Sequence, residues 1–272
     1  MSRREALATL GVAGLAGLSF RWPAPISRWG IQLYTVRSLL QRDFDGTLKA
    51  IGQIGYKEVE TAGYYNRSPA DVRKALDAAG LAAPSAHVDL NSVDTGLPAL
   101  LDACATIGHK WLVVPSLPRN SYTADGLKEV GEKLTKAAAA AKSADVRIAY
   151  HNHDVDFRPI GDSNGMELLL AASGPDVAAE LDVYWIVKSG GDPLAFINKH
   201  RGRVKMLHLK DASAAPEQAM RDVGSGTIDW KAVLSAGDAG GVEHALVEHD
   251  NPGADPIASA KASFEYLSHL KR

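Results

Sequence analysis

The segment VRIAYHNHDVDF, residues 146–157, decides how this chain folds. Its first half is an apolar, β-branched and aromatic run of strand type, and its second half carries His151 and His153 two residues apart. Because alternate residues of a strand point to the same face, both imidazoles project to one side. A strand of this kind that ends in two histidines indicates a site at its carboxyl end, and the rest of the chain tests that interpretation.

Seven other runs have the same character. They read GIQLY from Gly30, KEVET from Lys57, APSAH from Ala83, WLVVP from Trp111, VAAELD from Val177, RVKMLH from Arg203 and HALVE from His244. Together with the run at Val146 they begin 26 to 41 residues apart. Pro84 makes the third run the weakest strand, because proline interrupts a hydrogen-bonded ladder. The sequence therefore predicts eight strands.

The segments between these runs predict helices. DFDGTLKAIGQIG (43–55), SPADVRKALDAAG (68–80) and DGLKEVGEKLTKAAAAAKSA (125–144) have apolar residues at helical spacing, polar residues at the start and often glycine at the end. Strands that alternate with such helices imply parallel β-α-β units, and eight units favour closure into a (β/α)8 TIM barrel of the α/β class. We expect one barrel domain over residues 28–272.

The N-terminal 27 residues predict a signal segment. Arg3 and Arg4 precede the weakly apolar run ALATLGVAGLAGLSF (6–20), which resembles a twin-arginine export signal cleaved near Ala24. The alternative is an N-terminal helix on the domain surface. With export we expect a periplasmic protein, and no other segment reaches the ~18 apolar residues of a membrane span.

The amino-acid composition limits which kinds of binding partner are expected. The chain has 30 Lys and Arg against 32 Asp and Glu, without a basic block that could follow a phosphate backbone, so nucleic acid is disfavoured. Cys104 is the single cysteine and is expected to be buried in a helix. Nothing in the sequence decides whether the chain forms a homo-oligomer.

Polar side chains close the predicted strands. They are Gln32 and Tyr34, Glu60, His87, Ser116, His151 and His153, Asp182, His208 and Lys210, and Glu248 and Asp250. Barrel enzymes carry their chemistry at the carboxyl ends of the strands, and charged residues are rarely buried there unless they are paired or bound to something. The alternative, in which the histidines are hydrogen-bonded core residues, is disfavoured because four such groups fall on neighbouring strands.

The ordered motifs resemble the xylose isomerase-like TIM barrel superfamily, the sugar phosphate isomerase/epimerase group that includes inosose dehydratase. They are GIQLYTVR (30–37), IGYKEVE (54–60), SAHVDL (85–90), YHNHDVDF (150–157), ELDVYW (180–185), HLKD (208–211), VGSGTIDWKAVL (223–234) and LVEHD (246–250). The resemblance implies one divalent metal ion, Mn, Co, Zn or Mg, held by His151, Asp182, His208 and Glu248. His151 stands where many members have glutamate, which leaves open whether His151 or His153 is the ligand.

The resemblance also implies a reaction. A metal-bound sugar or keto-sugar would lose a proton to Glu248, His153 or His151 would return or donate a proton, and Lys210 would stabilise the oxyanion of the enediolate. Return of the proton gives isomerisation or epimerisation, and loss of a β-leaving group gives lyase, dehydratase or hydratase chemistry. A carbohydrate-binding barrel without turnover is a third alternative.

Further residues are expected to touch the carbohydrate. Glu60 and His87 would bond sugar hydroxyls, and Tyr34 and Trp185 would stack on a sugar face, although core filling explains the aromatic residues equally well. Gly224 and Gly226 are read as a loop that turns into a helix near Asp229 rather than as a phosphate cradle.

Overall fold

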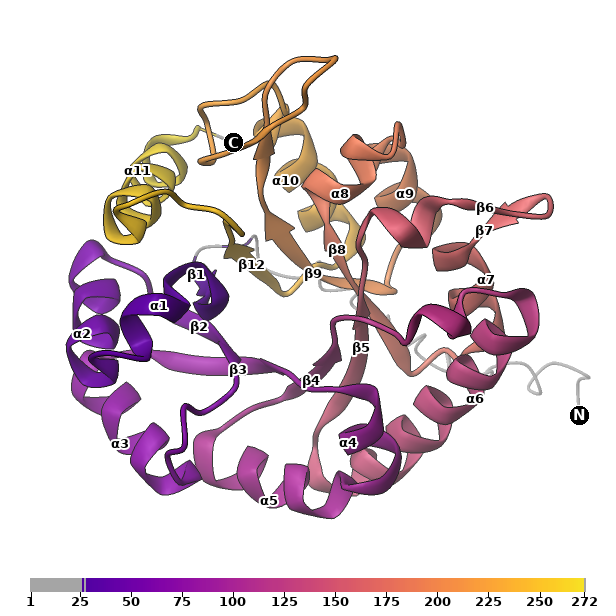
Figure 1. Cartoon of the computed structure of the whole chain (residues 1–272), viewed down its shortest axis with the longest axis horizontal. Helices are drawn as coiled ribbons and strands as arrows, with labels where there is room; N and C mark the ends of the chain where they lie inside the picture. Colours follow the sequence, from indigo (N-terminus) through magenta and orange to yellow (C-terminus); the bar gives the residue numbers. More distant parts are fainter. Residues whose placement is uncertain (1–25, 27, 272) are drawn as a thin grey trace, which may run out of the picture.

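Eight parallel strands close into a barrel in the computed structural model, which describes residue 26 and residues 28–271 (Figure 1). The order around the ring is β1-β12-β9-β8-β5-β4-β3-β2. The strands are β1 Trp29–Gln32, β2 Glu58–Ala62, β3 Ala82–His87, β4 Trp111–Val114, β5 Arg147–His151, β8 Val177–Asp182, β9 Val204–Leu209 and β12 His244–Val247. The predicted (β/α)8 barrel is confirmed. Apart from Ile26, the expected signal segment lies outside the described residues.

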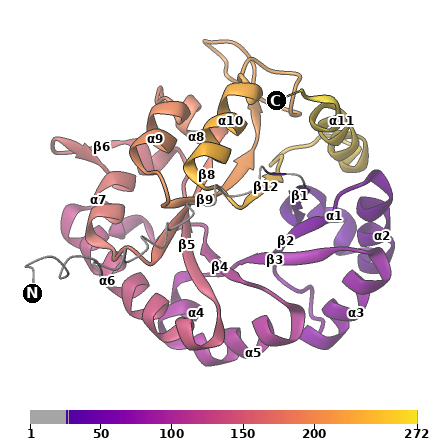
Figure 2. The ribbon, with the colours of Figure 1, turned by 180° about the vertical axis from the view of Figure 1, so that it is seen from behind.

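Helices surround the barrel on its outer side, as the views from both ends show (Figures 1 and 2). They are α1 Arg37–Leu40, α2 Phe44–Ile54, α3 Pro69–Ala79, α4 Leu90–Thr95, α5 Leu97–Ile107, α6 Ala124–Ala141, α7 Gly165–Ala172, α8 Val183–Lys188, α9 Pro193–Lys199, α10 Trp230–Gly240 and α11 Pro256–His269. Single 3-10 turns span Leu33–Val36, Arg119–Ser121, Lys142–Ala144 and Asp154–Phe157. Two short hairpins, β6 Pro159–Ile160 with β7 Ser163–Asn164 and β10 Asp211–Ala212 with β11 Met220–Arg221, project from the loops.

The helix ends follow the predicted signals. Asp43 and Ser68 accept hydrogen bonds from the backbone of the first turns of α2 and α3, which satisfies amide groups that have no partner inside the helix. Gly80 ends α3 with a φ of 67°, a left-handed conformation that glycine adopts without a steric penalty. Cys104 is buried in α5, as expected.

Pro84 lies within β3 and does not prevent the strand from forming. Its carbonyl accepts a hydrogen bond of 2.7 Å from the Lys110 amide, so the proline loses only a donor and keeps its acceptor. The register between β2 and β3 shifts between Glu58 and Glu60, which accommodates the missing amide.

The barrel interior changes from apolar to polar along the strands. A small apolar cluster fills part of the interior, formed by Trp111, Val113, Ala149, Ala178 and Met206. Two residues further along β5, β8 and β9, the side chains are His151, Glu180 and His208, and the next inward positions are His153, Asp182 and Lys210. Because side chains two residues apart share a face, the apolar cluster supports the polar levels above it. The fold thus gathers the polar residues at the carboxyl ends of the strands.

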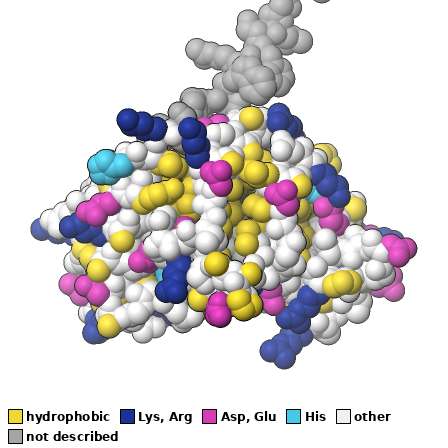
Figure 3. All heavy atoms as spheres, turned by 90° about the horizontal axis from the view of Figure 1, so that it is seen from above, with side chains coloured by type: hydrophobic (Ala, Val, Ile, Leu, Met, Phe, Trp, Pro, Cys, Tyr) yellow, Lys and Arg dark blue, Asp and Glu magenta, His cyan; other side chains and the backbone are white. Residues whose placement is uncertain are grey.

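The outer surface carries both signs of charge. On the face shown in Figure 3, Lys and Arg side chains are scattered among Asp and Glu and form no continuous basic band. Among the described residues, no helix combines the length and the apolar character needed to cross a bilayer.

Candidate active site

A cavity of about 580 Å³ opens at the carboxyl ends of the strands. His87, His151, His153 and Glu248 line it from β3, the end of β5 and the end of β12. Tyr34, which is 42% exposed, lies at its rim. The Arg37 guanidinium stacks 3.9 Å from the Tyr34 ring centroid and donates to the Asp250 carbonyl at 2.9 Å, so the loops after β1 and β12 are tied together. The cavity is of the size that accepts a small organic molecule.

The four predicted metal ligands meet beside this cavity, and two of them, His151 and Glu248, line it. His151, Asp182, His208 and Glu248 are buried, and each offers one ligand atom within 4.8 Å of the others. Two imidazole nitrogens and two carboxylate oxygens suit a divalent cation of the Mn, Co or Zn type. The donor chemistry therefore fits the expected metal ion. That these residues bind a metal stays a prediction.

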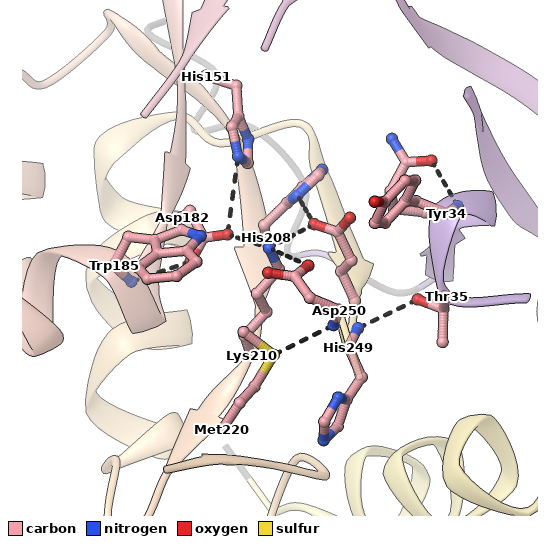
Figure 4. A network of polar contacts seen from close by, with 12 residues as sticks. Tyr34, Thr35, His151, Asp182, Trp185, His208, Lys210, Met220, His249 and Asp250 are labelled. Carbon is pink, nitrogen blue, oxygen red and sulfur yellow. Dashed lines mark hydrogen bonds and ion pairs between the residues drawn. The ribbon is translucent and has the colours of Figure 1, made fainter. Parts of the chain in front are cut away.

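Lys210 provides a fixed positive charge beside these donors. Its fully buried ammonium lies 2.9 Å from Asp182 Oδ2, 2.8 Å from Glu248 Oε2 and 2.9 Å from Asp250 Oδ1. Figure 4 shows Asp182, His208, Lys210 and Asp250 converging at this point. A buried ammonium needs such partners, because an unpaired buried charge is costly. A bound cation and Lys210 would share the same two carboxylates.

The two carboxylate oxygens of Glu248 have different surroundings. Oε2 accepts from His208 Nδ1 at 2.8 Å and lies 2.8 Å from Lys210 Nζ. No described residue bonds to Oε1, and the side chain lines the cavity. One carboxylate oxygen is thus held in place while the other is available to a ligand in the cavity.

A second carboxylate, Glu180, lies beneath the predicted ligands. Its Oε2 contacts three imidazoles, at 2.9 Å from His87 Nε2, 3.0 Å from His151 Nδ1 and 3.2 Å from His208 Nε2. Its Oε1 is buried and has no hydrogen-bond partner among the described residues. Glu180 therefore fixes the orientation of rings that reach the cavity, as carboxylates behind metal-binding histidines commonly do.

Glu60 also lies below the cavity rather than in it. It is fully buried, and its Oε1 contacts Gln32 Nε2 at 2.6 Å, His87 Nε2 at 2.8 Å and His208 Nε2 at 2.9 Å. The residue does not line the cavity. The predicted contact between Glu60 and a sugar hydroxyl is therefore replaced by a supporting role beneath the histidines, whereas His87 does reach the cavity.

The carboxylates control the charge of the histidines. Burial opposes protonation of His87, but Glu60 and Glu180 raise its pKa to about 9. Burial lowers the pKa of His153 to about 4, and the Lys210 ammonium adds to that effect. In the absence of a ligand, His87 is thus a cation and His153 a neutral ring at pH 7.

The same balance holds for the charged pair at the cavity wall. Burial lowers the pKa of Lys210, but Asp182 and Glu248 more than offset it and hold the pKa well above its ordinary value. Burial raises the pKa of Glu248, but Lys210 and His208 hold it well below its usual range. Glu248 is therefore ionised at neutral pH.

Trp185 lies behind His153 and outside the cavity lining. Its ring centroid is 5.6 Å from that of His153, and the Lys210 ammonium lies 5.7 Å from the Trp185 centroid. Because Trp185 is not among the residues that line the cavity, its stacking on a sugar face stays a prediction. Tyr34, by contrast, lines the cavity at its rim, where its stacking on a sugar also stays a prediction.

The family model of the xylose isomerase-like TIM barrel matches residues 48–270. The chain belongs to this family. The resemblance expected from the motifs is thus confirmed, and the site lies where the strands of a xylose isomerase-like barrel end.

Named relatives of this xylose isomerase-like barrel include sugar-processing proteins. The rhizopine catabolism protein MocC of Rhizobium meliloti is 25% identical over 82% of this chain and 80% of its own. The inosose dehydratase of Lacticaseibacillus casei is 22% identical over 82% of this chain and 88% of its own. Family membership indicates a small carbohydrate as substrate and leaves the reaction class between isomerase and lyase.

Solved structures agree on the fold. A sugar phosphate isomerase/epimerase from Parabacteroides distasonis has a TM-score of 0.78 and 26% identity, covering 88% of this chain and 93% of that one. The IolI protein, described with a binding zinc atom, has a TM-score of 0.68 and 17% identity, covering 88% and 96%. At the latter identity the likeness shows the fold alone.

Sequence reasoning missed Glu180 and Asp211. Glu180 precedes Asp182 by two residues, so the alternation that united His151 with His153 also placed Glu180 on the inner face. Asp211, buried at the end of the HLKD motif, accepts hydrogen bonds from the amides of Gly224, Gly226 and Ile228 and from the Trp230 indole. Those amides are therefore occupied. The structure supports a loop leading into α10 rather than a phosphate cradle.

Proposed function

We propose that this chain is a sugar isomerase or epimerase that removes a proton from a carbon next to the carbonyl of a sugar or keto-sugar. The observation that carries the proposal is the state of Glu248. Its Oε2 is held by His208 and Lys210, its other oxygen has no partner among the described residues, and the side chain lines the cavity. An ionised carboxylate in that position is a general base that is already oriented.

The neighbouring groups complete the reaction. Glu248 would take the proton from the carbon. His153, a neutral ring that lines the same cavity, would relay a proton from solvent to the adjacent carbon or oxygen, accepting it on one ring nitrogen while donating from the other. The Lys210 ammonium would favour the negative charge that develops on the substrate oxygen. A divalent cation held by His151, Asp182, His208 and Glu248 would supply further electrostatic stabilisation of that oxygen when bound.

A dehydratase or another lyase is the second candidate. It is supported by the inosose dehydratase relative, which aligns with 82% of this chain, and by the unequal pair at the site, a carboxylate and an imidazole. In that reaction Glu248 takes the carbon-bound proton and later releases it to solvent. The bond to the β-hydroxyl breaks, and the neutral His153 ring relays a proton from solvent to the departing oxygen, so that water leaves and a double bond forms.

Solvent exchange tests the proposal. Incubation of the metal-loaded protein with a panel of keto-sugars in deuterium oxide should place deuterium at the carbon next to the carbonyl, with an isomer as product; loss of one water from the product mass would select the dehydratase. Glu248→Gln should abolish both, while Glu243→Gln, a carboxyl that pairs with Arg147 away from the cavity, should retain them. Undiminished exchange in Glu248→Gln would refute the assignment of the base.

Metal content is measured in parallel. We expect about one equivalent of divalent metal in the parent protein and none in an Asp182→Ala, His208→Ala double variant. Equal content in both proteins would show that the metal is bound elsewhere or adventitiously.

We also propose that the protein is exported to the periplasm. The support is the pair Arg3 and Arg4 ahead of a weakly apolar run. When the full chain is expressed, cell fractionation should find the protein, without its signal segment, in the periplasm, and an Arg3→Lys, Arg4→Lys variant in the cytoplasm. Export of the variant at the parental level would remove the twin-arginine interpretation.

A further inference from the structure

A second cavity adjoins the one that contains the proposed base. It has a volume of about 700 Å³ and is formed by the loop after β4 and the loop after β5, which runs into the β6–β7 hairpin. Ser116 and His153 line both cavities. The two spaces therefore meet at His153, the residue proposed to deliver the proton.

The combined space exceeds what one sugar ring requires. Each cavity alone, at about 580 and 700 Å³, lies within the range of ~300–1,000 Å³ that holds a drug-sized ligand. A single six-membered ring at Glu248 would fill part of the first cavity and leave the second to solvent. A substrate with two linked units would occupy both.

The lining of the second cavity differs from that of the first. The side chains of Leu117, Val155 and Ile160 give it apolar walls. Arg119 and Arg158 add two guanidinium groups, of which Arg158 is paired with Asp154 at 2.8 Å. Apolar walls with a few hydrogen-bond donors suit the flat face of a ring that carries polar substituents. The acidic and imidazole groups required for proton transfer are concentrated in the first cavity.

We propose that the second cavity is a subsite for a second unit attached to the reacting sugar, so that the substrate class is a glycoside or disaccharide rather than a free monosaccharide. This inference rests on the proposed function only for the placement of the reacting sugar at Glu248. The bond that joins the two units passes Ser116 and His153. The second unit packs against Val155 and receives hydrogen bonds from Arg119.

Binding measurements test the subsite without requiring turnover. Isothermal titration calorimetry compares methyl β-glucoside with phenyl β-glucoside and cellobiose, and methyl β-galactoside with phenyl β-galactoside and lactose. We expect the two-unit compound of at least one series to bind 10-fold or more tightly than its methyl glycoside. Preference for the phenyl compound identifies an aromatic second unit, and preference for the disaccharide identifies a sugar.

Two pairs of variants test whether the higher affinity of the two-unit compounds arises in the second cavity. Val155→Trp fills the second cavity and should remove the 10-fold advantage while leaving the methyl glycoside affinity unchanged; Val155→Ala, which leaves the space open, should change the advantage less than threefold. Arg119→Ala should reduce the advantage, whereas Arg42→Ala, whose guanidinium contacts only the Ser38 carbonyl among the described residues, should not.

The outcomes separate this inference from the proposed function. Equal affinities of one-unit and two-unit compounds, an advantage that survives Val155→Trp, or no binding by any of the six compounds would overturn the subsite. A two-unit advantage that depends on Val155 supports the subsite even if no deuterium exchange is found. Exchange with monosaccharides alone would leave the proposed function intact and exclude the second unit.

Discussion

Replacement of Glu180 by glutamine should change the charge of His87 without a change in shape. The substitution keeps one carbonyl oxygen but removes the negative charge that contacts His87 at 2.9 Å, while Glu60 still contacts the same nitrogen at 2.8 Å. A hydrogen bond to a charged group contributes ~1.5–3 kcal/mol, which corresponds to ~1–2 pKa units. The pKa of His87, about 9 in the parent, should therefore fall by roughly that amount in Glu180→Gln.

The same change has a consequence for stability. Because the pKa of His87 in the folded state lies above its unfolded value of 6.5, the stabilisation is fully present below that pH and is lost as pH rises through about 9. In Glu180→Gln the loss should be complete at a lower pH, because the folded-state pKa is lower. The free energy of unfolding should therefore decrease less between pH 6 and pH 10 than in the parent, by ~1.5–3 kcal/mol.

The assay is NMR titration of ¹³C-labelled histidine rings in chelator-treated protein, with the His87 signal assigned from a His87→Gln variant. Glu58→Gln is the matched control. Glu58 also lies on the barrel, in β2, but it contacts His244 at 2.8 Å and not His87. An unchanged His87 midpoint in Glu180→Gln, or an equal shift in the control, would refute the reasoning.

Three further predictions concern buried polar groups. Lys210→Met leaves buried carboxylates without their cation and should lower the free energy of unfolding by ~3–5 kcal/mol at pH 7 in urea titrations; a loss below ~1 kcal/mol would contradict the buried ion pairs. Asp211→Asn keeps the shape of the side chain but weakens the hydrogen bonds that it accepts from the loop amides. Amide hydrogen exchange at residues 224–228 should therefore accelerate, by an amount that corresponds to ~1–3 kcal/mol of lost protection. Unchanged protection would show that Asp211 does not hold this loop. Burial lowers the pKa of His109 in the folded protein, so the stabilisation by its neutral ring is lost as the pH falls below 6.5. The free energy of unfolding should therefore decrease less between about pH 7 and 5 in His109→Gln than in the parent. Parallel plots of the free energy of unfolding against pH for the two proteins would exclude this contribution.

Periodicity predicted the barrel well because its signal is local. The runs at Val146 and Val177 begin with mostly apolar strand-forming residues, and Asp43 and Ser68 mark helix starts within their own segments. Even the strand that contains Pro84 formed, since the loss of one amide donor costs less than the burial of its neighbours gains.

The site was predictable at the level of which residues meet, and less so at the level of their tasks. His151, Asp182, His208 and Glu248 came together because each closes a strand of one ring. Whether a strand-end side chain faces the cavity or lies beneath it depends on strand register and tilt, which are properties of the closed barrel. For that reason Glu60 was assigned to the substrate although it supports the histidines from below.

The seam between β1 and β12 makes ligand binding a property of the whole ring. Parallel pairing joins Trp29–Ile31 to Ala245–Val247, and Glu248 follows that last ladder directly. When β1 and β12 are separated, Glu248 no longer lies beside the other three predicted metal ligands. A ligand of this site therefore binds only the closed barrel. By mass action, its binding free energy adds to the stability of every strand, including those that never touch it. Occupancy of one pocket would then slow the opening of the entire barrel.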